Sequence, residues 1–431
     1  MPGSRSEMNP KREIFFNKYS NIADAFNRLR VSTPTVLFDS SLKYGKHVGQ
    51  WFERKSSSTV PAVAVLSSEA SVRMQLNGAD QQVYRQSRRY IQYQPGKSHL
   101  VLLTFGDISS KEVNKHIGYF DADNGIFLKS NRNGYYWVKR SNTSGAAADV
   151  PIAQSEWNID KFDGTGPSRY TLDFSKVQIA LIDLEWLGVG RVRCGFVVDG
   201  TIAYAHEFLQ ANVGTKVYMK TATLPCRYEM QSCSALSSSV KLDQICASVM
   251  SEGGDSEPSG VLRYISTDDS LTSLTSAGAK VILSIRPKLT FKGQTNRVPL
   301  TLENIEVFSQ DADIHYHLNF GGSVIGGTSA VVWSDVSSSY SAIEYAIHPS
   351  GTVAGGINIA GGYIAASEDK KINFAGGARK AIARGVVLYL DPDGAHPTST
   401  VDKLTDQVSI TAETLGTNSD VGAVFEWIEE R

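Results

Sequence analysis

Short apolar segments that end in Asn-Gly or Asp-Gly pairs recur along the first half of this chain, and they constrain its fold more than any other feature. Such pairs stand at 77–78, 124–125, 133–134 and 199–200. An Asx-Gly pair favours the tight turns that match the twist of two antiparallel strands, so each pair is expected to close a β-hairpin. Many short strands joined by tight turns are typical of an antiparallel sandwich or jelly roll. The sequence therefore predicts an all-β protein.

Residue spacing within these segments also fits strands. Segments 100–105, 177–182 and 194–198 are apolar runs of strand length, and 72–76 alternates apolar and polar residues. Alternation with period two places successive side chains on opposite faces of a sheet. The two strand-like segments within 191–206, joined by Asp-Gly, are similar to the paired strands of concanavalin-like jelly rolls. That type of sandwich is expected for this part of the chain.

An acidic, Gly- and Ser-rich stretch, SEGGDSEPSG at 251–260, divides the chain and contains no apolar side chain. Such a composition is typical of a linker between domains. We expect a concanavalin-like jelly-roll sandwich at 36–252, a linker at 253–260 and a second antiparallel β-sandwich at 261–431. Each of the two large parts is long enough to bury a core of its own.

The first 35 residues are expected to form a short helical N-terminal arm. Ile22, Phe26 and Leu29 recur at helical spacing and would share one face of a helix. A stripe of this length is too short to be stable as an isolated helix in water, so it needs a partner surface. Two interpretations stay open: a helix that packs on its own domain, and an arm that docks on a neighbouring subunit.

Charge narrows the function classes. Lys plus Arg total 43 and Asp plus Glu total 44, which gives a formal net charge of −1. This balance argues against a protein that binds nucleic acid by neutralising many phosphates. Arg85, Arg88 and Arg89 form a short basic cluster, for which a solvated strand end or an intersubunit salt bridge is expected rather than a polyanion site.

Cysteine usage and hydropathy point to an intracellular place of assembly. The four cysteines, Cys194, Cys226, Cys233 and Cys246, form no Cys-x-x-Cys pair and have no histidine at zinc-ligand spacing. They are expected to be free thiols of a protein assembled in a reducing cytoplasm. The N-terminus has no signal-peptide core, and no stretch reaches the roughly 18 apolar residues needed to cross a bilayer, so no membrane insertion is expected.

Two acidic turns invite a metal-site interpretation. Asp121 and Asp123 imitate the opening of a calcium loop, but their flanks are strand-like, which favours a hairpin turn. Asp160 and Asp163 lie in a glycine-rich loop, where carboxylates that cap turns through backbone N–H groups are expected rather than cation ligands.

His315 and His317 place two imidazoles on one face of a predicted strand. Such a pair binds a transition metal only when a third ligand comes from elsewhere, and the sequence shows no such ligand. No metal ligand is therefore predicted.

The chain also lacks the common signatures of catalysis. It contains no nucleophile elbow, phosphate-binding glycine loop or His-Glu-x-x-His helix, so no catalytic residue and no cofactor-binding residue is predicted. Trp51, Trp137, Trp157 and Trp186 offer possible stacking platforms for sugars. In a sandwich of this size, most tryptophans are expected to belong to the core.

Four motifs carry a family resemblance. QSRRYIQYQPGK at 86–97, IGYFDADNGIF at 117–127 and WNIDKFDGTGP at 157–167 are followed by WLGVGRVRCGFVVDG at 186–200. In this order they resemble a widespread family of structural proteins of tailed-bacteriophage virions, over about residues 21–254. The resemblance implies a non-enzymatic component of the mature particle, in the tail, baseplate or fibre-attachment region.

The same resemblance implies localisation to the virion after assembly in the bacterial cytoplasm. Its expected partners are other virion proteins and further copies of this chain, with a trimer favoured by the habit of the family. No catalytic or ligand-binding residue follows from the motifs, which mark turns and folding positions. Two alternatives stay open: a carbohydrate-binding receptor adhesin that contacts a host-surface glycan, and a capsid decoration or head-fibre protein.

Overall fold

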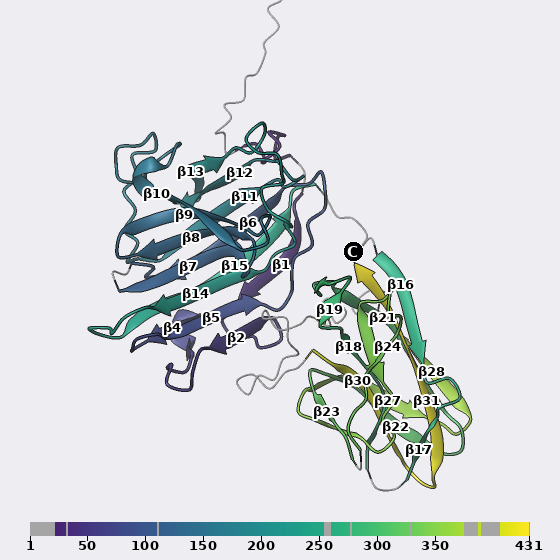
Figure 1. Ribbon diagram of the computed structural model, residues 1–431. Helices are drawn as coiled ribbons and strands as arrows, with labels where there is room; N and C mark the ends of the chain where they lie inside the picture. The colour runs from purple at the N-terminus through teal and green to yellow at the C-terminus, as the bar shows by residue number, and fades with distance from the viewer. Residues whose placement is uncertain are drawn as a thin grey trace, which may run out of the picture.

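The computed structural model shows a chain built from antiparallel strands (Figure 1). It describes residues 22–31, 33–109, 112–253, 260–275, 278–327, 329–374, 387–388 and 406–430. Two single-turn 3-10 helices, η1 (Ser67–Glu69) and η2 (Gln154–Glu156), interrupt the strands. The strands fall into two groups, β1–β15 and β16–β31, each forming a sandwich. The prediction of an all-β fold with two antiparallel, jelly-roll-like sandwiches is confirmed.

The first sandwich packs an eight-stranded sheet on a seven-stranded sheet in the described residues. The larger sheet has the order β13 (Thr201–Phe208), β12 (Val192–Val198), β11 (Gln178–Leu184), β6 (His99–Gly106), β15 (Val240–Ser251), β4 (Ser71–Leu76) and β3 (Ala64–Leu66), with β1 (Thr35–Ser41) also paired to β15. The smaller sheet has the order β10 (Ala148–Ala153), β9 (Gly134–Ser141), β8 (Gly125–Asn131), β7 (Val113–Phe120), β14 (Cys226–Ser232), β5 (Gln82–Ser87) and β2 (Trp51–Lys55).

Large aromatic side chains fill the space between these two sheets. Trp137 on β9 lies 5.8 Å from Phe196 on β12, centroid to centroid, and Trp157 packs 6.2 Å from the same ring. All three side chains are at most 3% exposed. Burying side chains of this size removes much apolar area from water, which is the main stabilising contribution to such a core.

The second sandwich packs two six-stranded sheets, counted over the described residues. One sheet has the order β16 (Gly260–Ser266), β31 (Ser419–Glu430), β21 (Leu300–Ser309) and β28 (Glu368–Asn373); β17 (Thr272–Leu274) pairs with β31, and β29 (Val387–Leu388) pairs with β21. The other has the order β24 (Ser334–Asp335), β25 (Ile343–Ala346), β18 (Lys280–Pro287), β30 (Val408–Thr414), β22 (Ile314–Phe320) and β27 (Ile357–Ile364). Two small hairpins join β19 (Thr290–Phe291) to β20 (Gln294–Thr295) and β23 (Ser323–Ile325) to β26 (Thr352–Ala354).

This second core draws on both of its sheets. Tyr316 and Ile410 come from one sheet, Phe425 and Trp427 from the other, and all four are at most 2% exposed. The two cores are separate clusters. Of the predicted linker, Gly253 and Gly260 lie among the described residues, and the boundary at 253–260 stays a prediction.

Three of the four Asx-Gly pairs close hairpins as expected. The pair at 199–200 joins β12 to β13 with positive φ angles of 48° and 79°, as a type I′ turn requires. Those at 124–125 and 133–134 lie at the β7–β8 and β8–β9 connections. The prediction for 77–78 is wrong, because this pair leads from β4 in one sheet to β5 in the other.

The helical prediction for the N-terminal arm is wrong where the structure describes it. Residues 22–31 form a tight loop closed by a β-bridge between Ala23 and Leu29, and the rest of the predicted arm up to residue 21 lies outside the described residues. Ile22 and Leu29 are 53% and 45% exposed, and Phe26 is half-buried. The apolar spacing resembled a helix, but polar contacts decide the local structure.

Arg30 fastens this loop to the first sandwich. Its guanidinium lies 2.7 Å from the Asp183 carboxylate and 2.5 Å from that of Glu252. Asp183 is completely buried and also pairs with Arg193 and accepts a hydrogen bond of 2.7 Å from the Tyr204 hydroxyl. Residues 22–31 therefore pack on their own domain, the first of the two interpretations of the arm.

The cysteines and the hydropathy complete the description. All four cysteines are free thiols; Cys194 and Cys226 are buried, while Cys233 and Cys246 are exposed. Burial raises the pKa of Cys226 above its ordinary range, so this thiol stays protonated at neutral pH. No helix within the described part of the chain is long and apolar enough to span a bilayer.

Candidate functional site

A cleft lies where the first sandwich meets the β19–β20 hairpin of the second. It has a volume of about 330 Å³. The first sandwich contributes Gln92, Thr221 and Thr223, and the second contributes Phe291, Lys292, Gln294, Thr295, Asn296, Arg297, Val298 and Pro299. Ligand sites of roughly 300–1,000 Å³ occur preferentially at such domain boundaries. The cleft is therefore the candidate binding site.

Arg297 lines the cleft and joins the two sandwiches. Its guanidinium lies 3.0 Å from the Asp121 carboxylate and 2.9 Å from that of Asp123, both in the β7–β8 turn. Its charged group also lies 5.5 Å from the centre of the Tyr90 ring. Two carboxylates thus neutralise this cation, so Arg297 offers no net positive charge to an anionic ligand.

The charges around Arg297 support this arrangement. Burial alone would lower its pKa, but Asp121, Tyr90 and Asp123 outweigh burial and raise it. Burial, together with the charge of Asp121, raises the pKa of Tyr90 to about 12. At neutral pH the contact therefore consists of one cation, two carboxylates and a neutral phenol.

Asn296 holds the hairpin side of the cleft rigid. Its side-chain amide donates hydrogen bonds of 3.0 Å to the Lys288 carbonyl and 2.7 Å to the Ala342 carbonyl. Its side-chain oxygen accepts a bond of 3.0 Å from the Val298 N–H. Since both ends of the amide are engaged, Asn296 positions the backbone and leaves recognition to its neighbours.

The neighbours present unused hydrogen-bonding groups. Among the described residues, no hydrogen bond engages the side-chain amides of Gln92 and Gln294. Thr295 adds an exposed hydroxyl, and Phe291 adds a half-buried aromatic ring. Neutral donors and acceptors beside one aromatic face suit a hydroxyl-rich, uncharged ligand.

The acidic turns singled out in the sequence have structural roles. Asp121 Oδ1 accepts hydrogen bonds of 2.8 Å from the N–H groups of Asp123 and Asn124, which confirms the hairpin-turn interpretation. Asp160 accepts from the N–H groups of Phe162 and Ser168, at 2.8 and 2.7 Å. The capping prediction for this second loop is also confirmed.

The tryptophans named as stacking platforms belong to the interior. Trp51, Trp137 and Trp157 are at most 3% exposed. Trp186 is partly buried, and its indole N–H donates to the Met219 carbonyl at 3.1 Å. Trp51, Trp137 and Trp157 therefore offer no open face to a sugar, which agrees with the core interpretation.

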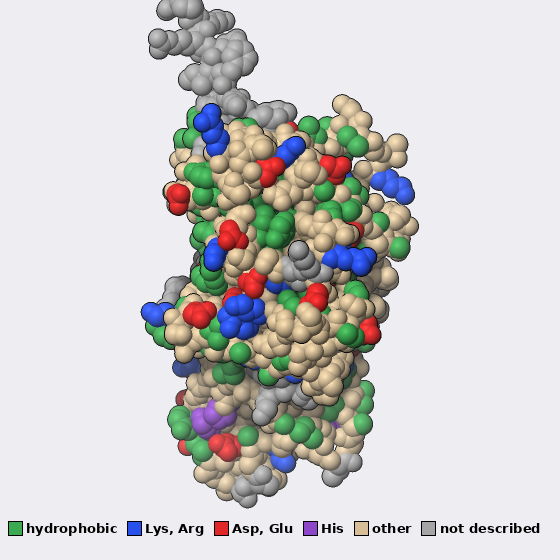
Figure 2. All heavy atoms as spheres, turned by 90° about the vertical axis from the view of Figure 1, so that its left-hand side faces the viewer, with side chains coloured by type: hydrophobic (Ala, Val, Ile, Leu, Met, Phe, Trp, Pro, Cys, Tyr) green, Lys and Arg blue, Asp and Glu red, His purple; other side chains and the backbone are tan. Residues whose placement is uncertain are grey.

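The basic cluster binds within the first sandwich; Arg85 is not a solvated strand end, and an intersubunit salt bridge stays a prediction. Arg85 is 1% exposed and bonds the Lys46 carbonyl and Gln244. Arg88 donates to the Val48 carbonyl at 2.7 Å, and Arg89 donates to the Leu37 carbonyl at 3.0 Å. These arginines bind backbone carbonyl groups of their own sandwich. On the face shown in Figure 2, acidic and basic side chains are interspersed.

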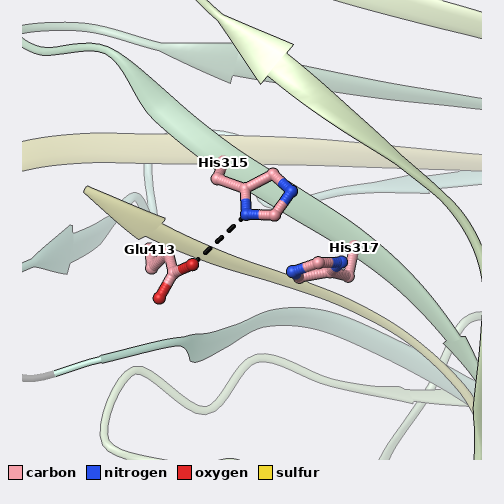
Figure 3. A group of neighbouring side chains, drawn as sticks. All are labelled: His315, His317 and Glu413. Atoms are coloured by element: carbon pink, nitrogen blue, oxygen red, sulfur yellow. Dashed lines mark hydrogen bonds and ion pairs between the residues drawn. The ribbon is translucent and has the colours of Figure 1, made fainter. Parts of the chain in front are cut away.

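The histidine pair lies as predicted, on the solvent face of β22. Ile314, Tyr316 and Leu318 point into the core, so His315 and His317 point outward. The sequence missed Glu413 on the neighbouring strand β30, whose carboxylate lies 3.2 Å from His315 Nδ1 (Figure 3). A signal for it existed in the alternation of the segment 408–414, but the register of the two strands did not follow from the sequence.

The glycines of the resembling motifs are needed for packing. A Cβ on Gly118 would lie 2.4 Å from the Ile126 carbonyl oxygen, and one on Gly195 would lie 2.2 Å from that of Ala203. A Cβ on Gly166 would meet the Asp160 carboxylate at 2.1 Å. Such close approaches leave room for no other residue. These motif positions therefore serve the fold.

Comparison with known proteins assigns no family to this chain. No protein-family model matches the chain, and no curated protein matches it. Among solved structures it is similar to the binding domain of botulinum neurotoxin serotype D/C, at 10% identity over 61% of this chain and 68% of that one, with a TM-score of 0.32. It is also similar to a legume lectin-like domain from Entamoeba histolytica, at 9% identity over 47% of this chain and 90% of that one, with a TM-score of 0.28.

A third similar structure is a protein with a galectin-like fold from Bacillus subtilis, at 10% identity over 51% of this chain and 96% of that one, with a TM-score of 0.31. The chain spans about half the length of an HCR/D structure that it also matches, 48%. Likenesses of this strength carry no argument about function.

Proposed function

We propose that this protein is a non-enzymatic attachment component of a tailed-phage particle and that it binds a host-surface glycan in the cleft between its sandwiches. The cleft, with its uncharged amides and hydroxyls beside Phe291, carries the binding half of the proposal. The motifs at 86–97, 117–127, 157–167 and 186–200 support the phage half by resemblance.

The chemistry of the cleft favours a neutral polyol. Gln92 and Gln294 each supply two N–H donors and one carbonyl acceptor, a set that matches the paired hydroxyls of a sugar ring. Arg297 is already neutralised by its two carboxylates, so a phosphate or carboxylate ligand gains little there. The side chain of Lys292 is exposed, 5.5 Å from the Phe291 ring centre, at the rim.

A glycan array probed with the untagged full chain tests the binding half. We expect a hit, and we expect calorimetric titration of that glycan to show about tenfold weaker binding for Gln92→Ala and for Gln294→Ala, since each removes about one hydrogen bond. Gln310→Ala makes the same change on an exposed side chain remote from the cleft and is the matched control. Absence of any glycan hit, or a hit unaffected by both cleft substitutions, would refute glycan binding here.

A cryo-EM map of the intact particle tests the phage half. Density at the tail, baseplate or fibre-attachment region, in a small multiple of three, is the expected outcome, with other virion proteins and further copies of this chain as partners. Hundreds of copies on the head lattice would support a capsid decoration or head-fibre protein instead. Absence from purified particles would refute virion localisation altogether.

The exposed apolar side chains of the N-terminal loop are the proposed docking residues. Ile22 and Leu29 stay accessible beside the half-buried Phe26, although the loop itself packs on its own domain. We expect Ile22→Asp combined with Leu29→Asp to leave the melting temperature unchanged and to remove the protein from particles. A variant that still incorporates fully would contradict this docking role.

A further inference from the structure

Two imidazoles and one carboxylate converge on the outer face of the second sandwich, far from the cleft in the fold. His315 and His317 stand two residues apart on β22, and His315 is the cross-strand partner of Glu413 on β30. One ligand atom from each lies within 4.8 Å of the others. Figure 3 shows the three side chains turned toward one another, and Figure 2 shows histidine side chains at the surface of this sandwich beside acidic ones.

We propose that His315, His317 and Glu413 form a mononuclear site for a first-row divalent transition metal, with Zn²⁺ as the fitting example. Two neutral imidazoles and one carboxylate, with further positions filled by solvent, form the donor set of open zinc sites. The mixed nitrogen and oxygen donors select against Ca²⁺ and Mg²⁺, which prefer oxygen ligands alone. This inference is independent of the function proposed above.

The spacing of the donors fits a metal at their centre. Metal–ligand bonds of about 2.0–2.1 Å in a tetrahedron place neighbouring ligand atoms about 3.3 Å apart. His315 Nδ1 and Glu413 Oε1 are already 3.2 Å apart. Since no pair of candidate atoms exceeds 4.8 Å, His317 has to approach by at most about 1.5 Å, which rotation of its side chain supplies.

Neighbouring side chains hold the two imidazoles in place. The Tyr363 ring on β27 stacks on His315 with centroids 4.5 Å apart and an angle of 18°. Gly361 lies opposite His317, and a Cβ there would lie 2.8 Å from the Tyr316 carbonyl oxygen and 3.3 Å from His317 Nδ1. The absent side chain therefore leaves the space that the His317 imidazole occupies. Such outer contacts orient metal ligands.

Exposure also suits a metal. The side chains of His315 and Glu413 are 25% and 39% exposed, so an ion can enter from solvent and retain water.

The test uses the untagged full chain, stripped with chelator, and titrates it with Zn²⁺ by calorimetry. We expect one Zn²⁺ per chain with a micromolar dissociation constant, and at least tenfold weaker binding in His315→Ala, His317→Ala and Glu413→Gln. Glu413→Gln retains a hydrogen-bond acceptor for His315 and removes only the anionic ligand. His47→Ala removes a half-buried imidazole of the first sandwich and is expected to change nothing.

A second measurement guards against variants that fold poorly. Zn²⁺ should raise the melting temperature of the wild-type protein and of His47→Ala, and it should leave that of Glu413→Gln unchanged, with all three equal in chelator. The visible spectrum of the Co²⁺-loaded protein should show the intense bands of a low coordination number. Lack of saturable binding below millimolar Zn²⁺, equal competition by Ca²⁺, or full binding by Glu413→Gln would each overturn the site.

Discussion

Replacing Arg30 by alanine tests whether the N-terminal loop belongs to the first sandwich. The substitution removes a guanidinium that lies 2.7 Å from the Asp183 carboxylate and 2.5 Å from that of Glu252. Both carboxylates are enclosed, with 0% and 9% of their side chains exposed. Two buried negative charges therefore lose a shared partner in one step.

The magnitude follows from what remains around the two carboxylates. Breaking a buried ion pair by removing one partner costs about 3–5 kcal/mol. Asp183 keeps Arg193 and the Tyr204 hydroxyl, and Glu252 keeps the Ser98 hydroxyl at 3.1 Å. We therefore expect a cost at or below the lower limit of this range, about 2–3 kcal/mol. A domain of this size loses about 2–4 °C of melting temperature per kcal/mol, so the transition should fall by about 4–12 °C.

Differential scanning calorimetry measures the effect, with Arg28→Ala as the control from the same loop. The Arg28 side chain is 48% exposed and pairs with Asp24, so its removal should cost no more than about 1 kcal/mol. A melting temperature of Arg30→Ala within 1 °C of the wild type, or equal to that of Arg28→Ala, would refute the packing of the loop described here.

The pH dependence of this variant has a defined sign. Burial raises the pKa of Glu252 above its ordinary 4.5, although the Arg30 hydrogen bond acts in the opposite direction. A carboxyl whose pKa is higher in the folded state stabilises the fold at low pH, and that contribution is lost as the pH rises through the folded pKa. Removing Arg30 raises this pKa further, so the deficit should be larger at pH 7.5 than at pH 5.

The other predictions concern packing, domain contact and acid stability. Gly118→Ala should lower the free energy of unfolding, measured by chemical denaturation, by about 1–3 kcal/mol, because its Cβ would lie 2.4 Å from a carbonyl oxygen. Gly49→Ala is the control and should lower it by less than about 0.5 kcal/mol, since no atom lies within 4 Å of that Cβ. Equal losses in the two variants would contradict the close approach. Arg297→Ala should increase the radius of gyration in small-angle scattering by uncoupling the sandwiches, and an unchanged radius would show that the contact does not hold them. Burial lowers the pKa of His99 and His116 from 6.5 to about 4. The stability that these neutral imidazoles contribute is complete above pH 6.5 and should fall as the pH drops toward 4. A melting temperature that does not change across this pH range, or a pH dependence that is the same in His116→Phe, would count against neutral buried imidazoles.

The sequence correctly predicted features that depend only on neighbouring residues, such as turn conformation and the face of a strand on which a side chain lies. The positive φ angles at 199–200 follow from the turn preferences of Asp-Gly, and the outward direction of His315 and His317 follows from the two-residue period of a strand. The same turn preference gave a wrong prediction at 77–78, where the chain crosses from β4 to β5 in the opposite sheet. The choice between a hairpin and such a crossing depends on which distant strands lie nearby.

Contacts between distant residues were beyond the sequence. Glu413 lies 98 positions from His315, and only the register of β22 against β30 brings the two together. Arg297 reaches the β7–β8 turn of another domain, 174 positions from Asp123. In the N-terminal loop, apolar spacing suggested a helix, but the buried partner of Arg30 was not recognisable before the sheet around it was known.

The pairing of β1 with β15 places the two ends of the first sandwich side by side. Thr35 and Ser251 are cross-strand partners, so the chain enters and leaves this domain at neighbouring points on one sheet. A unit whose ends coincide can be removed, replaced or inserted into another protein without altering the distance between the segments on either side. Recombination could therefore exchange this sandwich between chains as a unit in a single event.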